Sequence, residues 1–180
     1  MAGRLFAVVG PSGAGKDTLM AEASRRRPDL HIVRRVITRP PVPGGEPFES
    51  VSEAEFARRQ AAGDFVLDWE AHGLHYGIPR SLDHAIAEGR NALFNCSRGI
   101  IGRAWETFPG LAVIYVTASV PVLAERLEAR GRESKSEIAR RLARAAYEIP
   151  YGPQVCVVEN SGSLEEATKA FLDALQPESR

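Results

Sequence analysis

Near its N-terminus the chain reads Leu5-Phe6-Ala7-Val8-Val9-Gly10-Pro11-Ser12-Gly13-Ala14-Gly15-Lys16-Asp17. Five apolar residues predict a buried strand, and the glycine-rich run behind them nearly matches the P-loop pattern G-x-x-x-x-G-K-[ST]. Such a loop curls its backbone N–H groups around a phosphate chain, and the helix that follows presents the positive end of its dipole to the same anion. The stretch therefore predicts an α/β fold that binds ATP or GTP.

Within this loop we expect Lys16 to reach the terminal phosphates of the nucleotide. The position after the lysine holds Asp17 where the pattern has Ser or Thr, and Thr18 follows one place later. Asp17 either ligates Mg²⁺ or caps the helix, since a carboxylate suits both a hard cation and the first turn of a helix. The residues expected to bind the nucleotide here are Gly10, Pro11, Ser12, Gly13, Ala14, Gly15, Lys16, Asp17 and Thr18.

The composition bounds the classes of function. With 180 residues and 44% apolar composition, the chain can bury one substantial core, so we expect a single domain. Basic and acidic residues balance at 23 each, which argues against a broad nucleic-acid or membrane surface. Cys96 and Cys156 lack a metal-ligand pattern and read as buried thiols. The N-terminal apolar stretch is too short for a signal peptide, so we expect a cytoplasmic protein.

Strand-like and helix-like patterns alternate along the chain, which is typical of a three-layer fold with a parallel sheet covered by helices on both faces. We expect the first helix to run from the P-loop to before Pro28 and another to start at a Ser52–Glu55 capping box. Pro121 suits the first turn of a helix that ends near Ala129, and Ser163 caps the C-terminal helix. The predicted strands are 5–9, 32–36, 92–95, 111–116 and 155–158.

Two segments break this alternation and look like insertions that meet a substrate. Thr38 to Phe48 is rich in Pro and Gly and is expected to be a loop leading into a small lobe, about 37–80. A second segment, about 126–144, is rich in arginine, and Gly131 interrupts two helical patterns within it. Arginines on either side of a flexible joint are expected to form a lid.

The arginines suit phosphoryl transfer, because that reaction depends on alignment and on neutralising charge. A phosphate acceptor is already an anion at neutral pH and requires no general base. We expect Arg130 and Arg141 to act with Lys16 in catalysis, although a solvated helix face is the alternative for any surface arginine. His72 and His75 are expected to be hydrogen-bonding residues of the substrate lobe.

These pieces resemble the guanylate kinase family in their order along nearly the full chain. The matching residues are Gly10 to Lys16, Thr38-Arg39-Pro40 with Gly44 to Glu46, Tyr76-Gly77, Arg130-Gly131 and Arg141-Leu142. The resemblance implies the P-loop kinase fold, with the substrate lobe and lid, and places Asn160 by the adenine. It departs from the family at the acceptor: Val42 and Phe48 stand in the phosphate clamp, and Ile78 and Asn95 stand where guanylate kinases read guanine.

Other residues resemble the ribose 1,5-bisphosphate phosphokinases within this family. They are Gly15-Lys16-Asp17, Val36 to Arg39, His72 to Gly77, Asn95 to Arg98, and Arg130 to Glu133 followed by Glu137-Ile138. The resemblance implies transfer of the γ-phosphoryl group of ATP, with Mg²⁺, to the 1-phosphate of ribose 1,5-bisphosphate, giving 5-phosphoribosyl 1-diphosphate in phosphonate breakdown. The acceptor carries no base.

On this resemblance the small-molecule sugar phosphate is expected to contact Arg39, Asp68, His75, Tyr76, Asn95, Ser97, Arg98, Arg132, Arg141 and Arg144. Arg126, Arg130 and Asn160 are added to the nucleotide site, and Asp17 is the metal ligand. For Arg98 a salt-bridged helix start is the alternative. Guanylate kinase proper and a non-catalytic interaction module remain the alternative functions, and a homodimer is left open.

Overall fold

The computed structural model describes residues 2–41, 46–131, 134–145, 152 and 154–176, without the side chains of Arg144 and Ala145. Its strands are β1 (Leu5–Val9), β2 (His31–Ile32), β3 (Val36–Ile37), β4 (Glu49–Ser50), β5 (Phe65–Ala71), β6 (Leu74–Pro79), β7 (Ala92–Asn95), β8 (Ala112–Thr117) and β9 (Val155–Glu159). Its helices are α1 (Lys16–Arg26), α2 (Glu53–Ala61), α3 (Leu82–Ala87), α4 (Ile101–Thr107), α5 (Val120–Arg130), α6 (Lys135–Ala145) and α7 (Leu164–Ala174), with a 3₁₀ turn at Arg98–Ile100. Within this part of the chain no helix is long and apolar enough to cross a membrane.

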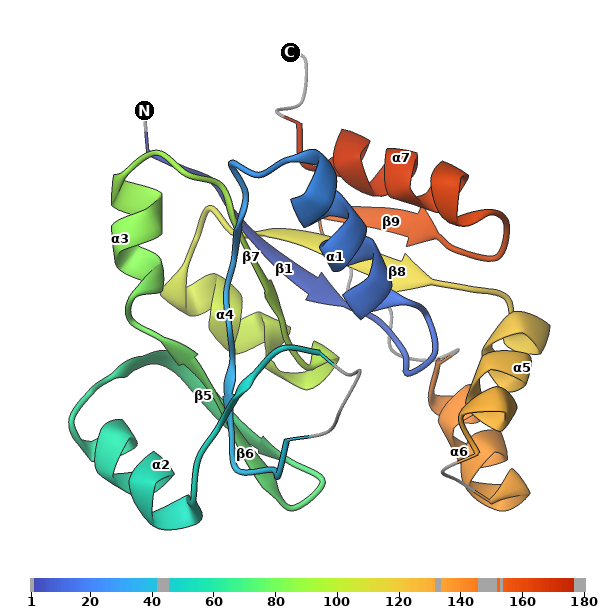
Figure 1. The fold of residues 1–180 in the computed structure, drawn as a ribbon, viewed down its shortest axis with the longest axis horizontal. Coiled ribbons are helices and arrows are strands. Elements are labelled where there is room, and N and C mark those ends of the chain that lie inside the picture. Colours follow the sequence, from blue (N-terminus) through green and yellow to red (C-terminus); the bar gives the residue numbers. More distant parts are fainter. Residues whose placement is uncertain (1, 42–45, 132–133, 146–151, 153, 177–180) are drawn as a thin grey trace.

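The strands form two sheets. The first is parallel throughout, in the order β2-β7-β1-β8-β9, with β1 at its centre. The second has the order β4-β3-β6-β5 and is mostly antiparallel. Figure 1 shows the second sheet with α2 as a lobe beside the main sheet, and α5 and α6 as a helix pair at another side.

Side chains of β1 alternate between two cores, which explains the layers. Phe6 and Val8 pack with residues of α1, α5 and α7 on one face. Leu5, Ala7 and Val9 pack on the other face with residues of α3, α4 and the second sheet. A central strand buried on both faces reads as a continuous apolar run. The three-layer prediction is therefore confirmed for the main sheet.

The helix boundaries agree with the local signals. The α1 helix ends at Arg26, just before Pro28, and α2 begins after Ser52, whose side chain accepts from the backbone N–H of Glu55. The α5 helix has Pro121 in its first turn. Ser163 and Glu166 form a complete capping box at α7.

Two predictions about strands and burial were wrong. The predicted strand over 32–36 divides into β2, which pairs with β7 in the first sheet, and β3, which pairs in the second. The segment is where the chain crosses between the sheets, and the charged Arg34 and Arg35 lie at the crossing. The hairpin strands β5 and β6 and the short β4 were not predicted. Cys96 is buried as expected, but Cys156 is exposed on β9, the edge strand of the first sheet.

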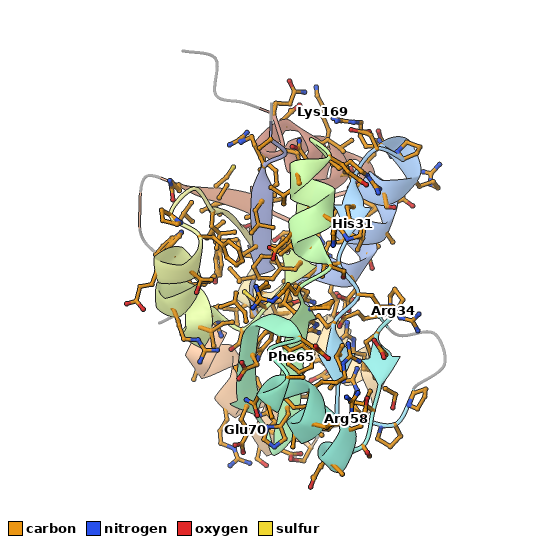
Figure 2. All side chains as sticks on the ribbon, turned by 90° about the vertical axis from the view of Figure 1, so that its left-hand side faces the viewer. His31, Arg34, Arg58, Phe65, Glu70 and Lys169 are labelled. Carbon is orange, nitrogen blue, oxygen red and sulfur yellow. The ribbon has the colours of Figure 1, made fainter. Side chains whose placement is uncertain are left out.

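Figure 2, seen from the side, separates the two bodies of the molecule. His31 and Lys169 lie in the body of the main sheet, whereas Arg58, Phe65 and Glu70 lie in the lobe. Arg34 lies between them, on the segment that joins the sheets. The loop after β1 and the lobe therefore line the same cavity, which is described below.

Candidate active site

The loop after β1 has the backbone conformation of a phosphate cradle. Gly10 and Gly15 have φ angles of 148° and 91°, in the region that favours glycine. A Cβ on Gly10 would lie 2.0 Å from the Val116 carbonyl oxygen, and one on Gly15 would lie 2.4 Å from Asn160 Nδ2. Both glycines are therefore required by positive φ and by close approach of neighbouring atoms.

Lys16, the first residue of α1, folds back over the loop. Its Nζ donates to the carbonyl oxygens of Gly10 (2.9 Å) and Pro11 (3.1 Å). Burial lowers the pKa of Lys16 from 10.5 to about 8; the Asp17 carboxylate opposes this shift, whereas Arg35 and Arg98 add to it. An ammonium held among like charges is ready to pair with an incoming polyphosphate.

Asp17 and Thr18 place oxygen atoms at the start of α1. Asp17 Oδ1 accepts from Asn95 Nδ2 at 3.0 Å, and both residues line the cavity described below together with Thr18. Gly15 is the N-cap of α1, and no side chain of the described residues caps it. A carboxylate and a hydroxyl at a phosphate site suit Mg²⁺, which takes few protein ligands and fills its octahedron with phosphates and water. The residues present therefore fit this ion. In the described part of the chain, no three His, Cys, Asp or Glu side chains lie together as a metal site of their own.

The back of the loop is braced by two residues distant in sequence. Asn160, which follows β9 and is 5% exposed, donates from Nδ2 to the Ala14 carbonyl oxygen at 2.7 Å. Arg126 of α5 donates to the carbonyl oxygens of Gly13 (3.1 Å) and Asn160 (2.8 Å). Both therefore support the loop from behind; the contacts with the nucleotide predicted for them stay predictions.

One cavity of about 330 Å³ joins the P-loop to the lobe. The predicted site residues that line it are Gly10, Pro11, Ser12, Gly13, Gly15, Lys16, Asp17, Thr18, Arg39, Tyr76, Asn95, Ser97, Arg98 and Arg130. Its ionised lining is mainly cationic, with five Lys or Arg side chains against Asp17 and Glu46. A polyanion is the ligand that such a lining favours.

Other predicted residues lie outside this lining. Ala14 is buried under the loop, Asp68 accepts from Gln60 Nε2, and His75 packs on Phe56 with ring centroids 5.4 Å apart. Arg141 of α6 does reach the loop, because its Nη1 donates to Ser12 Oγ at 2.9 Å. Val42, Gly44 and Arg132 lie outside the described residues, as does the side chain of Arg144.

The lining also contains Arg35, Glu46, Trp69, Ala71 and Cys96, for which no ligand contact was predicted, and His72, which was expected to be a hydrogen-bonding residue of the substrate lobe. Arg35, Trp69 and Ala71 lie in none of the matched motifs, because they come together only through the packing of the lobe on the main sheet. His72, with φ 54°, and Gly73 form the two-residue turn of the β5–β6 hairpin, a signal that the dipeptide His-Gly did offer. Burial raises the pKa of the Cys96 thiol to about 12, so it is protonated and not a nucleophile.

The positions at which guanylate kinases read guanine have other roles here. Ile78 is 0% exposed and belongs to the core between the lobe and the main sheet. Asn95 is 7% exposed and directs its amide at Asp17. Ile78 therefore offers the cavity no hydrogen bond, and the Asn95 amide is engaged with Asp17.

Comparison with known proteins decides the family. The family model described as guanylate kinase matches residues 2–178. The chain belongs to the guanylate kinase family. The guanylate kinase from Anaplasma phagocytophilum, 19% identical, superposes with a TM-score of 0.72 over 97% of this chain and 85% of that one, which confirms the fold.

Relatives of higher identity carry another name. The ribose 1,5-bisphosphate phosphokinase PhnN of Rhizobium etli is 49% identical over 98% of this chain and 92% of its own length. The bifunctional ribose 1,5-bisphosphokinase-thymidine phosphorylase of Cupriavidus necator is 46% identical over 99% of this chain. The chain spans only 30% of that bifunctional relative's length.

Proposed function

We propose that this chain transfers the γ-phosphoryl group of ATP to the 1-phosphate of ribose 1,5-bisphosphate, giving 5-phosphoribosyl 1-diphosphate and ADP. The proposal rests on one observation above all. A P-loop opens into a cavity whose ionised lining is mainly cationic, in a chain nearly half identical to enzymes named for this reaction.

The residues support a direct displacement. An oxygen of the 1-phosphate forms a bond to the γ-phosphorus, and the bond from that phosphorus to the β-phosphate oxygen breaks. The acceptor is already an anion, so no general base is needed. Lys16 would hold the β- and γ-phosphates, while Arg39, Arg98 and Arg130 would neutralise charge at the transferring group.

Two oxygen donors would hold Mg²⁺ when it is bound. These are the Asp17 carboxylate and the Thr18 hydroxyl, and the ion would supply positive charge that offsets the charge of the phosphates. Asn95 fixes the Asp17 carboxylate by its 3.0 Å hydrogen bond. A cytoplasmic location, a role in phosphonate breakdown and a homodimer stay predictions.

The decisive experiment compares acceptors. Purified protein is given ATP and Mg²⁺ with either ribose 1,5-bisphosphate or GMP at equal concentration, and ADP release is followed while ³¹P NMR identifies the product. We expect ribose 1,5-bisphosphate to be strongly preferred and the two coupled resonances of a sugar 1-diphosphate to appear beside those of ADP. Lys16→Ala is the control for P-loop dependence. Preference for GMP would replace the proposed function with guanylate kinase, and unchanged biological activity of Lys16→Ala would favour an interaction module.

A further inference from the structure

One buried cation in the cavity has no role in the mechanism above. Arg35 lies directly before β3, where the chain crosses from the main sheet to the lobe, and it is 8% exposed. Its side chain lines the cavity together with Lys16 and Arg98. Burying a guanidinium costs desolvation free energy unless the charge is paired, so a buried arginine needs a protein partner or a bound ligand.

Glu46 and Tyr76 hold the Arg35 side chain in one orientation. Nε of Arg35 donates to Glu46 Oε1 at 2.7 Å, and its Nη2 donates to Glu46 Oε2. The guanidinium carbon lies 5.2 Å from the centroid of the Tyr76 ring, which stacks on Trp69 at 5.3 Å. Arg35 is therefore pre-organised by the wall of the lobe.

This pairing leaves donor capacity unused. An arginine has five N–H donors, and Glu46 takes one from Nε and one from Nη2. Within the described part of the chain no other acceptor is recorded for Arg35. The remaining donors belong to a residue that lines the cavity, so they are available to a molecule bound there.

The electrostatics favour an anion at this position. Lys16, Arg35 and Arg98 line one cavity, and the charges of Arg35 and Arg98 each lower the pKa of Lys16. Such repulsion is relieved when a dianion lies between the cations. A guanidinium fork matches the geometry of phosphate oxygens better than any neutral group.

We propose that Arg35 binds the phosphate group of the acceptor that does not react, with Glu46 and Tyr76 as its positioning residues. This inference rests on the proposed function and deepens it. The reacting phosphate must lie beside the P-loop, near Lys16. The pentose then separates the second phosphate from the first, and that second group meets the wall of the lobe, where Tyr76 holds Arg35.

The test asks whether loss of the Arg35 side chain affects only an acceptor that carries the second phosphate. Wild-type protein and the double variant Arg35→Gln/Glu46→Gln are assayed with ribose 1,5-bisphosphate and with ribose 1-phosphate, which lacks the second phosphate. We expect the double variant to lose about 10- to 100-fold in kcat/KM for the bisphosphate, mostly through KM, as for one charge-assisted contact. Its kcat/KM for ribose 1-phosphate should stay within about twofold of wild type, because no contact with that acceptor is lost.

The variants are chosen to separate binding from stability. Replacing both partners by glutamine avoids leaving one charge buried alone. The matched control, Arg59→Gln/Glu49→Gln, removes a 2.8 Å ion pair of the same lobe whose residues do not line the cavity, and both acceptors should respond to it equally. If the first double variant melts below the assay temperature, Arg35→Lys decides by the same comparison, since it keeps the charge but loses the fork.

Each outcome has a distinct meaning. A loss that is equal for both acceptors makes the Arg35–Glu46 pair purely structural and overturns the inference alone. Unchanged kinetics with the bisphosphate overturns it as well. Failure of the wild-type protein to use ribose 1,5-bisphosphate overturns the proposed function, and the inference with it.

Discussion

Lys16 combines a positive charge with a buried position, and its pKa of about 8 makes nucleotide binding sensitive to pH. A bound polyphosphate requires the ammonium form, so above pH 8 binding must take up a proton. We expect the affinity for ATP to fall as pH rises from 7.5 to 9.5, by up to about tenfold per unit once Lys16 is neutral in the free protein. Calorimetric titration in buffers of different ionisation enthalpy measures both the affinity and the proton uptake.

The control for this prediction is Lys16→Arg. Its guanidinium remains charged from pH 7.5 to 9.5. The variant should bind ATP more weakly than wild type, but its affinity should not fall as pH rises. An identical pH profile for the two proteins would assign the titration to another group.

Asp17 can be tested as a metal ligand at the same scale. We expect Asp17→Ala to lower turnover and to recover partly at high Mg²⁺, because the ion loses a carboxylate oxygen. The matched control is Asp83→Asn, which changes the first-turn acid of α3 away from the cavity. If both variants lower only the melting temperature, with the Mg²⁺ dependence of turnover unaltered, then Asp17 acts on the helix dipole alone.

The P-loop is an element whose shape depends on distant strands and helices. Removing the Asn160 side chain takes away the 2.7 Å donor to the Ala14 carbonyl oxygen and leaves it only the longer 3.4 Å contact with Arg126 Nη1, at a cost of about 1 kcal/mol. We expect Asn160→Ala to lower the melting temperature and to raise KM for ATP. Asn91→Ala removes an acceptor from the Arg4 N–H far from the loop, so it should lower stability without changing KM. Equal KM values in the two variants would contradict a bracing role for Asn160.

The joint between α5 and α6 depends on one backbone conformation. Gly131 ends α5 with φ 61°, where an alanine costs about 1 kcal/mol. Gly102 lies inside α4, where a Cβ would meet nothing within 4 Å, and alanine gains about 0.5–1 kcal/mol there. We therefore expect Gly131→Ala to destabilise and Gly102→Ala to stabilise in urea unfolding. If both substitutions changed the free energy of unfolding in the same direction, the left-handed conformation of Gly131 would not be the cause of the effect.

At the scale of the whole molecule, the proposed ligands would lie in the cavity between the P-loop of the main sheet and the lobe. Because nucleotide binds the folded state alone, a concentration of 100 times Kd adds about 2.7 kcal/mol. For a chain of this size that is a rise of about 5–10 °C in melting temperature.

Thermal melts with a non-hydrolysable ATP analogue and Mg²⁺ measure this rise. Lys16→Ala should lose it, whereas Lys169→Ala, an exposed position on α7 in the main body (Figure 2), should keep it. A full rise in Lys16→Ala would move the nucleotide site away from the P-loop.

What the sequence by itself determined is local. The P-loop, the proline that follows the end of α1 and the Ser163 cap are patterns within a few consecutive residues, and their chemistry acts over the same distance. For this reason strand β1, the starts of α2, α5 and α7, and the cavity residues of the loop could be predicted. The resemblance to the family added Tyr76, Asn95 and Arg98, which line the same cavity.

Only the tertiary structure decided which side chains face one another. The strand predicted over 32–36 is divided between two sheets, and that division carries Arg35 to Glu46 and Tyr76. No periodicity marks such a crossing, because β2 pairs with β7, about 60 residues away, whereas β3 pairs with β4 and with β6, which is about 40 residues away. Local reasoning predicted burial for both cysteines and was correct for Cys96, but it missed the exposure of Cys156, which follows from the position of β9 at the edge of the sheet. Position in the sheet order, rather than residue type, sets that exposure.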